Sequence, residues 1–334
     1  MTLVERRPDA DDQALARAAD LLNGTTSAVL LAHINPDADA LGSALALGLG
    51  LAQSGMKVAV SFAEPSAVPE SLSALPGQHL LVDPDDLPDH PELVVTLDVG
   101  SPARLGALES LLDGASRVLV VDHHATNTRF GDDHLVDPMA EATGVLVARL
   151  LDAMGIQLNP DIATNLYAGL ATDTVSFRHA TAATHELAAR LVGAGAHPAE
   201  LMAPITDLHP FGWLEMLAAV LGRAVLVPGV AAGADLVHTC VTLSDGDGLR
   251  PEEVDSVIDI VRTTAPGGVT AVAKQVEHGR WQVSLRSSGS TDVSALATVL
   301  GGGGHTWAAG FTHDGDYPGA MSRLLHVLAG PRAR

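Results

Sequence analysis

Aspartate and histidine residues follow directly after three apolar runs of this 334-residue chain. The runs are "VLLAH", "VVTLD" and "VLVVDHH", and one further aspartate follows helix-like residues in "YAGLATDTVSF". The candidate metal ligands are His33, Asp37, Asp39, Asp98, His123 and Asp173. Oxygen and imidazole ligands without thiolate suit Mg²⁺ or Mn²⁺, and the imidazoles favour Mn²⁺ or another transition metal.

A ligand set of this size is too large for one open catalytic ion and therefore predicts two ions. Two divalent ions can share a bridging carboxylate and activate a water molecule for in-line attack on phosphorus. Without metal, clustered carboxylates would repel one another and raise each other's pKa values, and two ions remove this cost. The residues therefore indicate phosphoryl chemistry at a two-metal site.

Each of these residues has a simpler explanation when it is considered alone. Asp98 or Asp173 could be an ordinary turn or N-cap residue, and His33 could be a core histidine with satisfied hydrogen bonds. The "DHH" run could be the polar start of a loop. Their shared position after apolar runs, with two carboxylates four and six residues beyond His33, favours the metal site.

The elements that must position these residues alternate along the first half of the chain. Strand-like runs are predicted at 27–33, 57–62, 92–100 and 117–124, with helix-like stretches between and after them. Strands that alternate with helices predict a doubly wound, mainly parallel α/β sheet. The carboxyl ends of parallel strands lie at one edge, where ligands bind, so the sheet would bring the candidate ligands together.

The chain is long for one compact core, and its length suits two domains. We expect a metal-binding domain at 15–205 and a helical linker at 206–224, where the strand–helix rhythm changes. A smaller α/β domain, in which strands come first, is expected at 225–330.

Composition excludes some classes of partner. The formal net charge is −21, so the chain lacks the broad basic face that a long nucleic acid would need. A small anionic substrate remains open if metal ions reverse the sign of the charge locally. Cys240 is the only cysteine, which excludes an internal disulfide and a cysteine-rich zinc site, and we expect it to be buried.

The sequence also indicates where the protein resides. The amino-terminal "MTLVERRPDADDQ" is charged and has no apolar core region, so it is not a secretory signal. No stretch of about 20 uncharged apolar residues is present, as a membrane span would need. We therefore expect a soluble, cytoplasmic protein that does not bind membranes.

The second domain carries a separate signal in "LRSSGS" and "GGGGHTWAAG". Glycine runs let a backbone approach a ligand closely and turn its amide groups toward anions. Arg286 can bind a phosphate through two parallel hydrogen bonds, Ser287 and Ser288 can donate hydrogen bonds, and His305 ends the glycine run. A flexible hairpin tip followed by a packing helix is the alternative explanation of the glycines.

Four motifs in order, "HINPDADALGS", "TLDVGS", "DHHATN" and "ATDT", resemble those of the DHH phosphoesterase superfamily. "GGGGHTWAAG" resembles the characteristic sequence of the companion DHHA1 domain, and the likeness extends over roughly residues 15–330. Chain length and the second domain look most like the oligoribonuclease and pAp-phosphatase (nanoRNase-type) branch. The extra glycine in the run of four leaves only the register of that loop open.

The resemblance implies roles for the residues of the first domain. One metal ion would be held by His33, Asp37 and Asp98. The other would be held by Asp39, Asp98, His123 and Asp173, which makes Asp98 the bridge. Asp122 would orient a histidine, as metal sites commonly require, and His124 would face the scissile phosphate.

The resemblance also implies substrate-binding residues and an active site in a cleft between the two domains. In the second domain the distal phosphate or nucleotide would contact Arg286, Ser287, Ser288, Gly303, Gly304 and His305. In the first domain Asn127 and Arg129 follow the "DHH" run and are further candidates for substrate contact.

The expected function is metal-dependent hydrolysis of di- to tetranucleotides, of the 3′-phosphate of pAp, or of cyclic dinucleotides. The expected cofactors are two divalent ions, with Mn²⁺ favoured over Mg²⁺ and Co²⁺. The partner is a short nucleotide substrate, and the likeness is compatible with a homodimer. Three alternatives stay open: a family II-type pyrophosphatase, a RecJ-like single-strand exonuclease, and a nucleotide-binding regulator without catalytic activity.

Overall fold

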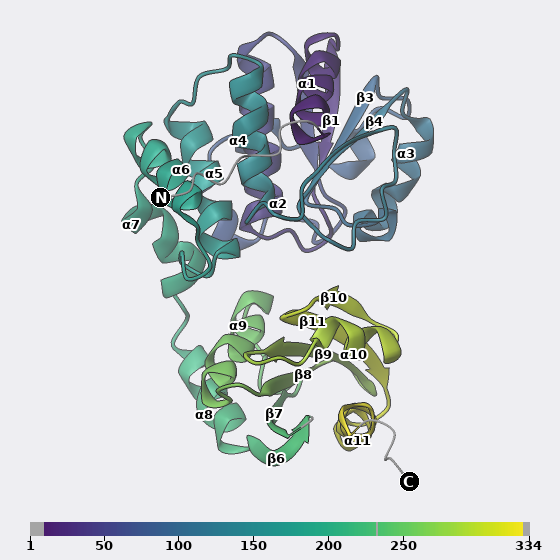
Figure 1. Ribbon diagram of the computed structural model, residues 1–334, viewed down its shortest axis with the longest axis vertical. Coiled ribbons are helices and arrows are strands. Elements are labelled where there is room, and N and C mark those ends of the chain that lie inside the picture. Colours follow the sequence, from purple (N-terminus) through teal and green to yellow (C-terminus); the bar gives the residue numbers. More distant parts are fainter. Residues whose placement is uncertain (1–9, 232, 330–334) are drawn as a thin grey trace. The chain divides into compact units, whose positions relative to one another are not determined.

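The computed structural model describes residues 10–231 and 233–329 (Figure 1). The chain divides into two compact units between Leu208 and His209, inside the stretch predicted as a linker. Two parts of the sequence-based expectations lie outside the described residues. One is most of the amino-terminal stretch that we expected not to be a signal, and the other is the last residue of the second predicted domain. No helix among the described residues has the length and apolar character that crossing a membrane requires.

The first unit is built on a five-stranded sheet in the order β2-β1-β3-β4-β5, and every neighbouring pair is parallel. Its strands are β1 (Ser27–Leu31), β2 (Lys57–Ser61), β3 (Leu93–Leu97), β4 (Val118–Asp122) and β5 (Asp133–Val136). The strands β3 and β4 are buried along their whole length, which explains their nearly continuous Val and Leu sequences. The predicted parallel α/β sheet is confirmed.

Both faces of this sheet are covered. The helices of the unit are α1 (Ala10–Asn23), α2 (Ala38–Gln53), α3 (Leu111–Gly114), α4 (Thr143–Ala153), α5 (Pro160–Asp173), α6 (Ala182–Gly193) and α7 (Pro198–Met202). Leu30 and Val95 pack into a core with residues of α1, α2, α4 and α5, whereas Val29 and Val94 pack on the opposite face against residues 105–112. Side chains that alternate between two cores are the expected pattern for a sheet covered on both sides.

Two segments of the first unit differ from the sequence-based expectation. The strand β5 was not predicted, because it is short and carries Asp133 and His134. The stretch after "TLDVGS" was expected to be helical, but Pro102–Ser110 is a 3₁₀ segment broken at Gly106, whose φ is 59°. The left-handed conformation of that glycine interrupts the regular helix.

The second unit contains a six-stranded mixed sheet in the order β10-β11-β9-β8-β7-β6. Its strands are β6 (Val225–Ala231), β7 (Ala234–Val241), β8 (Val269–Glu277), β9 (Arg280–Ser287), β10 (Gly303–His305) and β11 (Ala308–Asp314). Only β7 and β8 pair in parallel. The strands β10 and β11 were not predicted, because the four glycines conceal the strand pattern.

Helices cover both faces of the second sheet as well. They are α8 (Gly212–Gly222), α9 (Pro251–Val261), α10 (Val293–Val299) and α11 (Tyr317–Leu328). One core joins α10 and α11 to Leu285 of β9, and the other joins α8 and α9 to Val237 of β7. Cys240 lies in the first of these cores with an unpaired thiol, so its predicted burial is confirmed.

Candidate metal centre

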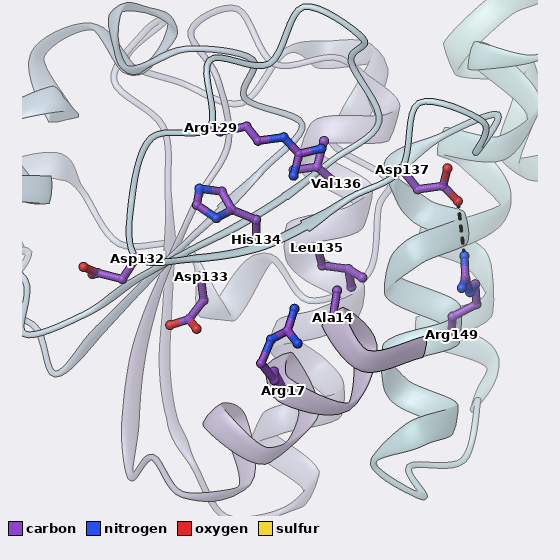
Figure 2. Close-up of a pocket in the computed structure, with 10 residues that line it drawn as sticks. All are labelled: Ala14, Arg17, Arg129, Asp132, Asp133, His134, Leu135, Val136, Asp137 and Arg149. Carbon is purple, nitrogen blue, oxygen red and sulfur yellow. Dashed lines mark hydrogen bonds and ion pairs between the residues drawn. The ribbon is translucent and has the colours of Figure 1, made fainter. Parts of the chain in front are cut away.

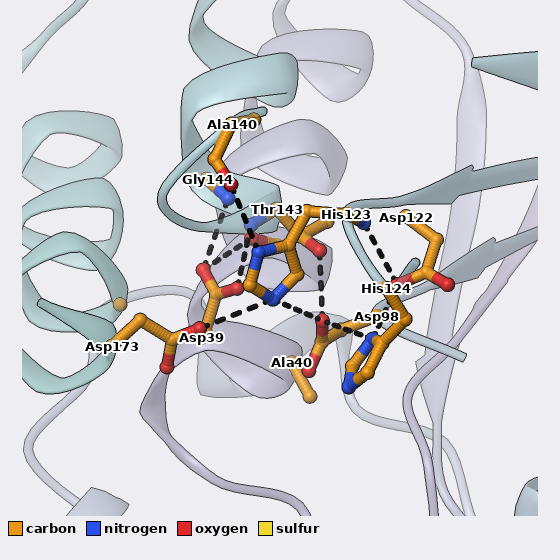
Figure 3. A network of polar contacts seen from close by, with 12 residues as sticks. Asp39, Ala40, Asp98, Asp122, His123, His124, Ala140, Thr143, Gly144 and Asp173 are labelled. Carbon is orange, nitrogen blue, oxygen red and sulfur yellow. Dashed lines mark hydrogen bonds and ion pairs between the residues drawn. The ribbon is translucent and has the colours of Figure 1, made fainter. Parts of the chain in front are cut away.

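The carboxyl edge of the first sheet gathers the residues that the sequence singled out. His33 lies two residues beyond β1, Asp98 follows β3 directly, and Asp122 ends β4. The remaining residues come from the same edge or from helices beside it: His123, His124, Asp37, Asp39 and Asp173. Figure 3 shows part of this set, with Asp39, Asp98, His123 and Asp173 turned toward one another. The segments are far apart in sequence, and the parallel sheet brings them together.

Asp98 lies between two histidines and offers a different carboxylate oxygen to each. Its Oδ2 atom is 3.6 Å from Nε2 of His33, and its Oδ1 atom is 3.5 Å from Nε2 of His123. The same nitrogen of His33 is 3.7 Å from Oδ2 of Asp37, and that of His123 is 3.2 Å from Oδ2 of Asp173. This is the arrangement that a bridging carboxylate between two ions requires.

Three groups of residues have ligand atoms within 4.8 Å of one another, so that each could hold a metal ion. They are His33–Asp37–Asp98, Asp39–His123–Asp173 and Asp98–His123–His124. The first two resemble the predicted ligand sets, except that Asp98 is not in the second group. The third includes His124, which the family resemblance assigns to the substrate, so the division of labour between the two histidines stays a prediction.

The charges of this cluster favour a bound cation. Burial, together with the charges of Asp173 and Asp98, raises the pKa of Asp39 well above its ordinary value. Burial also raises the pKa of Asp173 to about 7, although the hydrogen bond with His123 opposes the shift. Burial would lower the pKa of His123, but hydrogen bonding to Asp173 and the charge of Asp98 outweigh it and raise that pKa to about 10. Divalent cations would relieve this repulsion, so the residues fit the predicted metals.

The backbone around the cluster is strained at several residues that are not glycine. Positive φ angles occur at Asn35, Asp98, Arg129 and 175–177, and each lies in one of the four sequence motifs or within three residues of its end. Asp98 has a φ of 62°, and the β-branched Val175 has a φ of 53°. Such conformations cost of order 1–3 kcal/mol each and concentrate at functional sites. The surrounding packing must enforce these conformations, because they would otherwise relax.

Asp122 supports the cluster from the buried end of β4. It is fully buried, and its Oδ1 accepts hydrogen bonds from Nδ1 of His124 at 2.7 Å and from the backbone nitrogen of His123 at 2.9 Å. Its Oδ2 accepts a hydrogen bond from Nδ2 of Asn127 at 2.6 Å. Asp122 therefore fixes the ring of His124, the supporting role that the resemblance implies for it stays a prediction, and the side chain of Asn127 is used within the protein.

The amino terminus of α4 was not recognised in the sequence as part of the site. The backbone nitrogens of Thr143 and Gly144 donate to Oδ2 and Oδ1 of Asp39 at 2.6 and 2.9 Å. The buried hydroxyl of Thr143 donates to Oδ1 of Asp98 at 2.8 Å. A helix amino terminus stabilises negative charge, so α4 holds two candidate ligands in place. The helix itself was predicted, but no sequence spacing linked it to Asp39.

Gly169 allows the helix α5 to approach Asp39 closely. A Cβ atom at this position would lie 2.5 Å from Oδ1 and 2.8 Å from Cα of Asp39. Both atoms are closer than a real Cβ contact, so any larger residue would displace the carboxylate or the helix. The packing of α2 on α5 therefore sets the position of Asp39.

In the second unit, the predicted substrate residues lie at the end of β9 and in β10. Nη1 of Arg286 donates to the backbone oxygen of Leu285 at 3.1 Å, and burial lowers the pKa of this arginine. The hydroxyl of Ser288 donates to the backbone oxygens of Ala265 and Gly268 at 2.5 and 3.4 Å, so it fastens a neighbouring loop. Ser287 ends β9, and the second half of the glycine run, with His305, pairs with β11 through Gly303, Gly304 and His305.

A parallel α/β sheet with clustered carboxylates and imidazoles at its carboxyl edge has the ligand chemistry of a divalent-metal site. Residues 27–170 match the DHH family, N-terminal domain, and residues 233–329 match the DHHA1 domain. The chain therefore belongs to the DHH family, and it is an enzyme that hydrolyses phosphoester bonds. The predicted family and enzyme class are confirmed.

Individual relatives span most of the chain. The bifunctional oligoribonuclease and PAP phosphatase NrnA of Thermus thermophilus is 32% identical, over 93% of this chain and 92% of that protein. The cyclic-di-AMP phosphodiesterase GdpP of Geobacillus thermodenitrificans is 27% identical, over 90% of this chain and 47% of that protein. The crystal structure of an exopolyphosphatase-related protein from Bacteroides fragilis has the same fold, with a TM-score of 0.84 at 20% identity over 98% of this chain and 97% of that chain.

Proposed function

We propose that this enzyme hydrolyses di- to tetranucleotides to mononucleotides and removes the 3′-phosphate of pAp, with cyclic dinucleotides as further substrates. The observation that carries the proposal is the position of Asp98, whose two oxygens face His33 and His123 separately. The relative from Thermus thermophilus, named for activity on oligoribonucleotides and PAP, supports the choice of substrates.

Two divalent ions, with Mn²⁺ favoured, are part of the proposal. His33, Asp37 and Asp98 would hold one, and Asp39, Asp98, His123 and Asp173 the other. The chemistry that such ions supply is a lowered pKa for bound water and stabilisation of the charge that develops on a phosphoryl group. Thr143 and the amino terminus of α4 orient the carboxylates of Asp98 and Asp39 for this purpose.

The remaining side chains would bind and orient the substrate. Because Nδ1 of His124 donates to Asp122, the ring is held in one orientation, and we propose that it contacts an oxygen of the scissile phosphate. Arg286, Ser287 and the loop Gly303–His305 would contact the distal phosphate or nucleotide. With a net charge of −21 the chain lacks a broad basic surface to which a long nucleic-acid strand could bind, which supports a limit on substrate length. Cytoplasmic location and a homodimer remain predictions.

The test is a substrate panel with purified protein and Mn²⁺: pApA, pAp, cyclic di-AMP, inorganic pyrophosphate and a 24-residue oligonucleotide. We expect turnover of pApA and pAp that greatly exceeds turnover of the 24-mer. A preference for the 24-mer would contradict the limit on substrate length, and a preference for pyrophosphate would assign the chain to a different reaction. Asp98→Asn should abolish turnover, whereas a regulator without catalysis would keep its binding and its output.

A further inference from the structure

A cavity of about 330 Å³ lies beside the edge strand β5 of the first unit (Figure 2). It is lined by α1, by the loop that leads into β5, by β5 itself and by α4. None of its lining residues belongs to the three groups that could hold a metal. The cavity is therefore a separate feature of this domain.

Three arginines from three different elements line this cavity: Arg17 of α1, Arg129 of the loop and Arg149 of α4. They occur together although the chain carries a net charge of −21 and only 19 lysines and arginines. Bringing like charges together costs free energy unless anions compensate them. The three arginines can therefore attract an anion only where neighbouring carboxylates leave their positive charge uncompensated.

Each carboxylate that lines this cavity already has a partner, and one of these partners, Arg149, lines the cavity as well. Asp133 pairs with Arg117, which does not line the cavity, at 2.6 Å, and Oδ2 of Asp132 accepts a hydrogen bond from the backbone nitrogen of Val118 at 2.9 Å. Asp137 pairs with Arg149 at 3.4 Å. Within the described part of the chain, neither Arg17 nor Arg129 has an ion-pair partner. Their two positive charges are thus available to a ligand.

The backbone of Arg129 is held in place before any ligand arrives, and its side chain is exposed. Its backbone nitrogen donates to Oδ1 of Asn127 at 2.7 Å, and its φ of 52° is unusual for a residue other than glycine. Asn127 is itself fixed by Asp122 and by the backbone oxygen of Val99. A loop fastened in this way lowers the entropy that binding would cost. The structure also places the side chain of Arg129, a predicted substrate contact, on this cavity.

We propose that this cavity binds a phosphate-bearing anion through Arg17, Arg129 and Arg149, at a site distinct from the metal centre. Guanidinium groups bind phosphate oxygens through paired, charge-assisted hydrogen bonds, and several arginines can surround one tetrahedral anion. The volume exceeds that of a phosphate group, so the ligand is either free phosphate or the phosphate of a larger molecule such as a nucleoside monophosphate.

Calorimetric titration of the Mn²⁺-treated protein with inorganic phosphate, and separately with 5′-AMP, tests the proposal. Binding to the Asp98→Asn variant should persist, because Asp98 does not line the cavity. Arg17→Ala in the same background should weaken binding by roughly tenfold or more, as loss of a charge-assisted contact predicts. If 5′-AMP binds more tightly than inorganic phosphate, the ligand is a nucleotide. If 5′-AMP binds equally or more weakly, the ligand is free phosphate.

The matched control is Arg190→Ala, which removes an exposed arginine of the same unit that pairs with Asp152 outside the cavity. It should bind both anions like its parent. The proposal is overturned if Arg17→Ala binds like this control while keeping the parent's unfolding temperature, or if Asp98→Asn alone abolishes binding. Arg17→Lys, which keeps the charge but not the paired donors, should fall between parent and Arg17→Ala. The titration requires no turnover, so its result is independent of the proposed activity.

Discussion

The Nδ1 atom of His124 lies 2.7 Å from Oδ1 of Asp122 and donates a hydrogen bond to it. The adjacent His123 is oriented by a different partner, because its own Nδ1 lies 3.1 Å from the backbone oxygen of Ala140. Its Nε2 is consequently directed toward Asp98 and Asp173. Two neighbouring histidines therefore have different supports, which is the structural basis for giving them different roles.

His123→Ala should weaken Mn²⁺ binding, because it removes a nitrogen that lies beside two candidate ligands. His124→Ala should keep the wild-type number of bound ions and lose turnover of pApA by roughly 100-fold or more, as removal of a group that acts on the reacting phosphate predicts. Metal content after dialysis, Mn²⁺ titration and initial rates measure the two effects. Equal loss of metal in both variants would show that His124 is itself a ligand.

Thr143→Val should weaken metal binding roughly 10- to 100-fold, because the residue fixes the carboxylate of Asp98 without binding metal itself. The variant also leaves a buried acceptor without its donor, which costs about 1–3 kcal/mol of unfolding free energy. Thr143→Ser retains the hydroxyl and serves as the control. Mn²⁺ titration and denaturant unfolding measure both effects, and an unchanged affinity in Thr143→Val would remove this residue from the site.

Gly169→Ala should destabilise the first unit by about 1–3 kcal/mol and impair metal binding, because the new methyl group would overlap Asp39. Gly193→Ala, at the end of α6, is the matched control, since a Cβ atom there would meet nothing within 4 Å. It should be neutral or stabilise by up to about 1 kcal/mol. Unfolding curves recorded with and without Mn²⁺ measure the difference. Similar behaviour of the two variants would contradict the close packing of α5 on α2.

The pairing of Asp245 with Arg223 should make the stability of the second unit depend on pH. Burial would raise the pKa of Asp245, but hydrogen bonds from Arg223 at 2.7 and 2.8 Å and from Thr242 outweigh it, and the pKa is lowered. A lowered pKa contributes stability that is fully present above the unfolded-state value of about 3.9 and is lost as pH falls through the folded-state value.

Asp245→Asn should therefore be less stable than wild type at pH 7, and the difference should shrink as the pH falls below about 4. Unfolding free energies measured from pH 7 to pH 3 give this comparison. Asp247→Asn, at an exposed carboxylate without an ion pair among the described residues, is the control. A difference between Asp245→Asn and wild type that stays constant down to pH 3 would mean that the ion pair does not set the pKa.

The sequence by itself determined the sheet and most of the candidate metal ligands. Continuous Val and Leu in β3 and β4 required cover on both faces, and this cover implied a parallel sheet. In such a sheet all strands end at one edge, so Asp98 and His123 could be expected to meet although other elements separate them in sequence. The strand β5 escaped detection because it is short, begins with the polar Asp133 and His134 and lies at the edge of the sheet.

Only the tertiary structure decided how those ligands are held and what lies beside them. Thr143 contacts Asp98 across 45 residues, and the approach of Gly169 to Asp39 depends on the packing of two helices. The presence of Arg17 and Arg129 at one cavity depends equally on where α1 packs. Periodicity and strand ends are local properties that a sequence displays, whereas distances between side chains of separate elements arise only when the chain has folded.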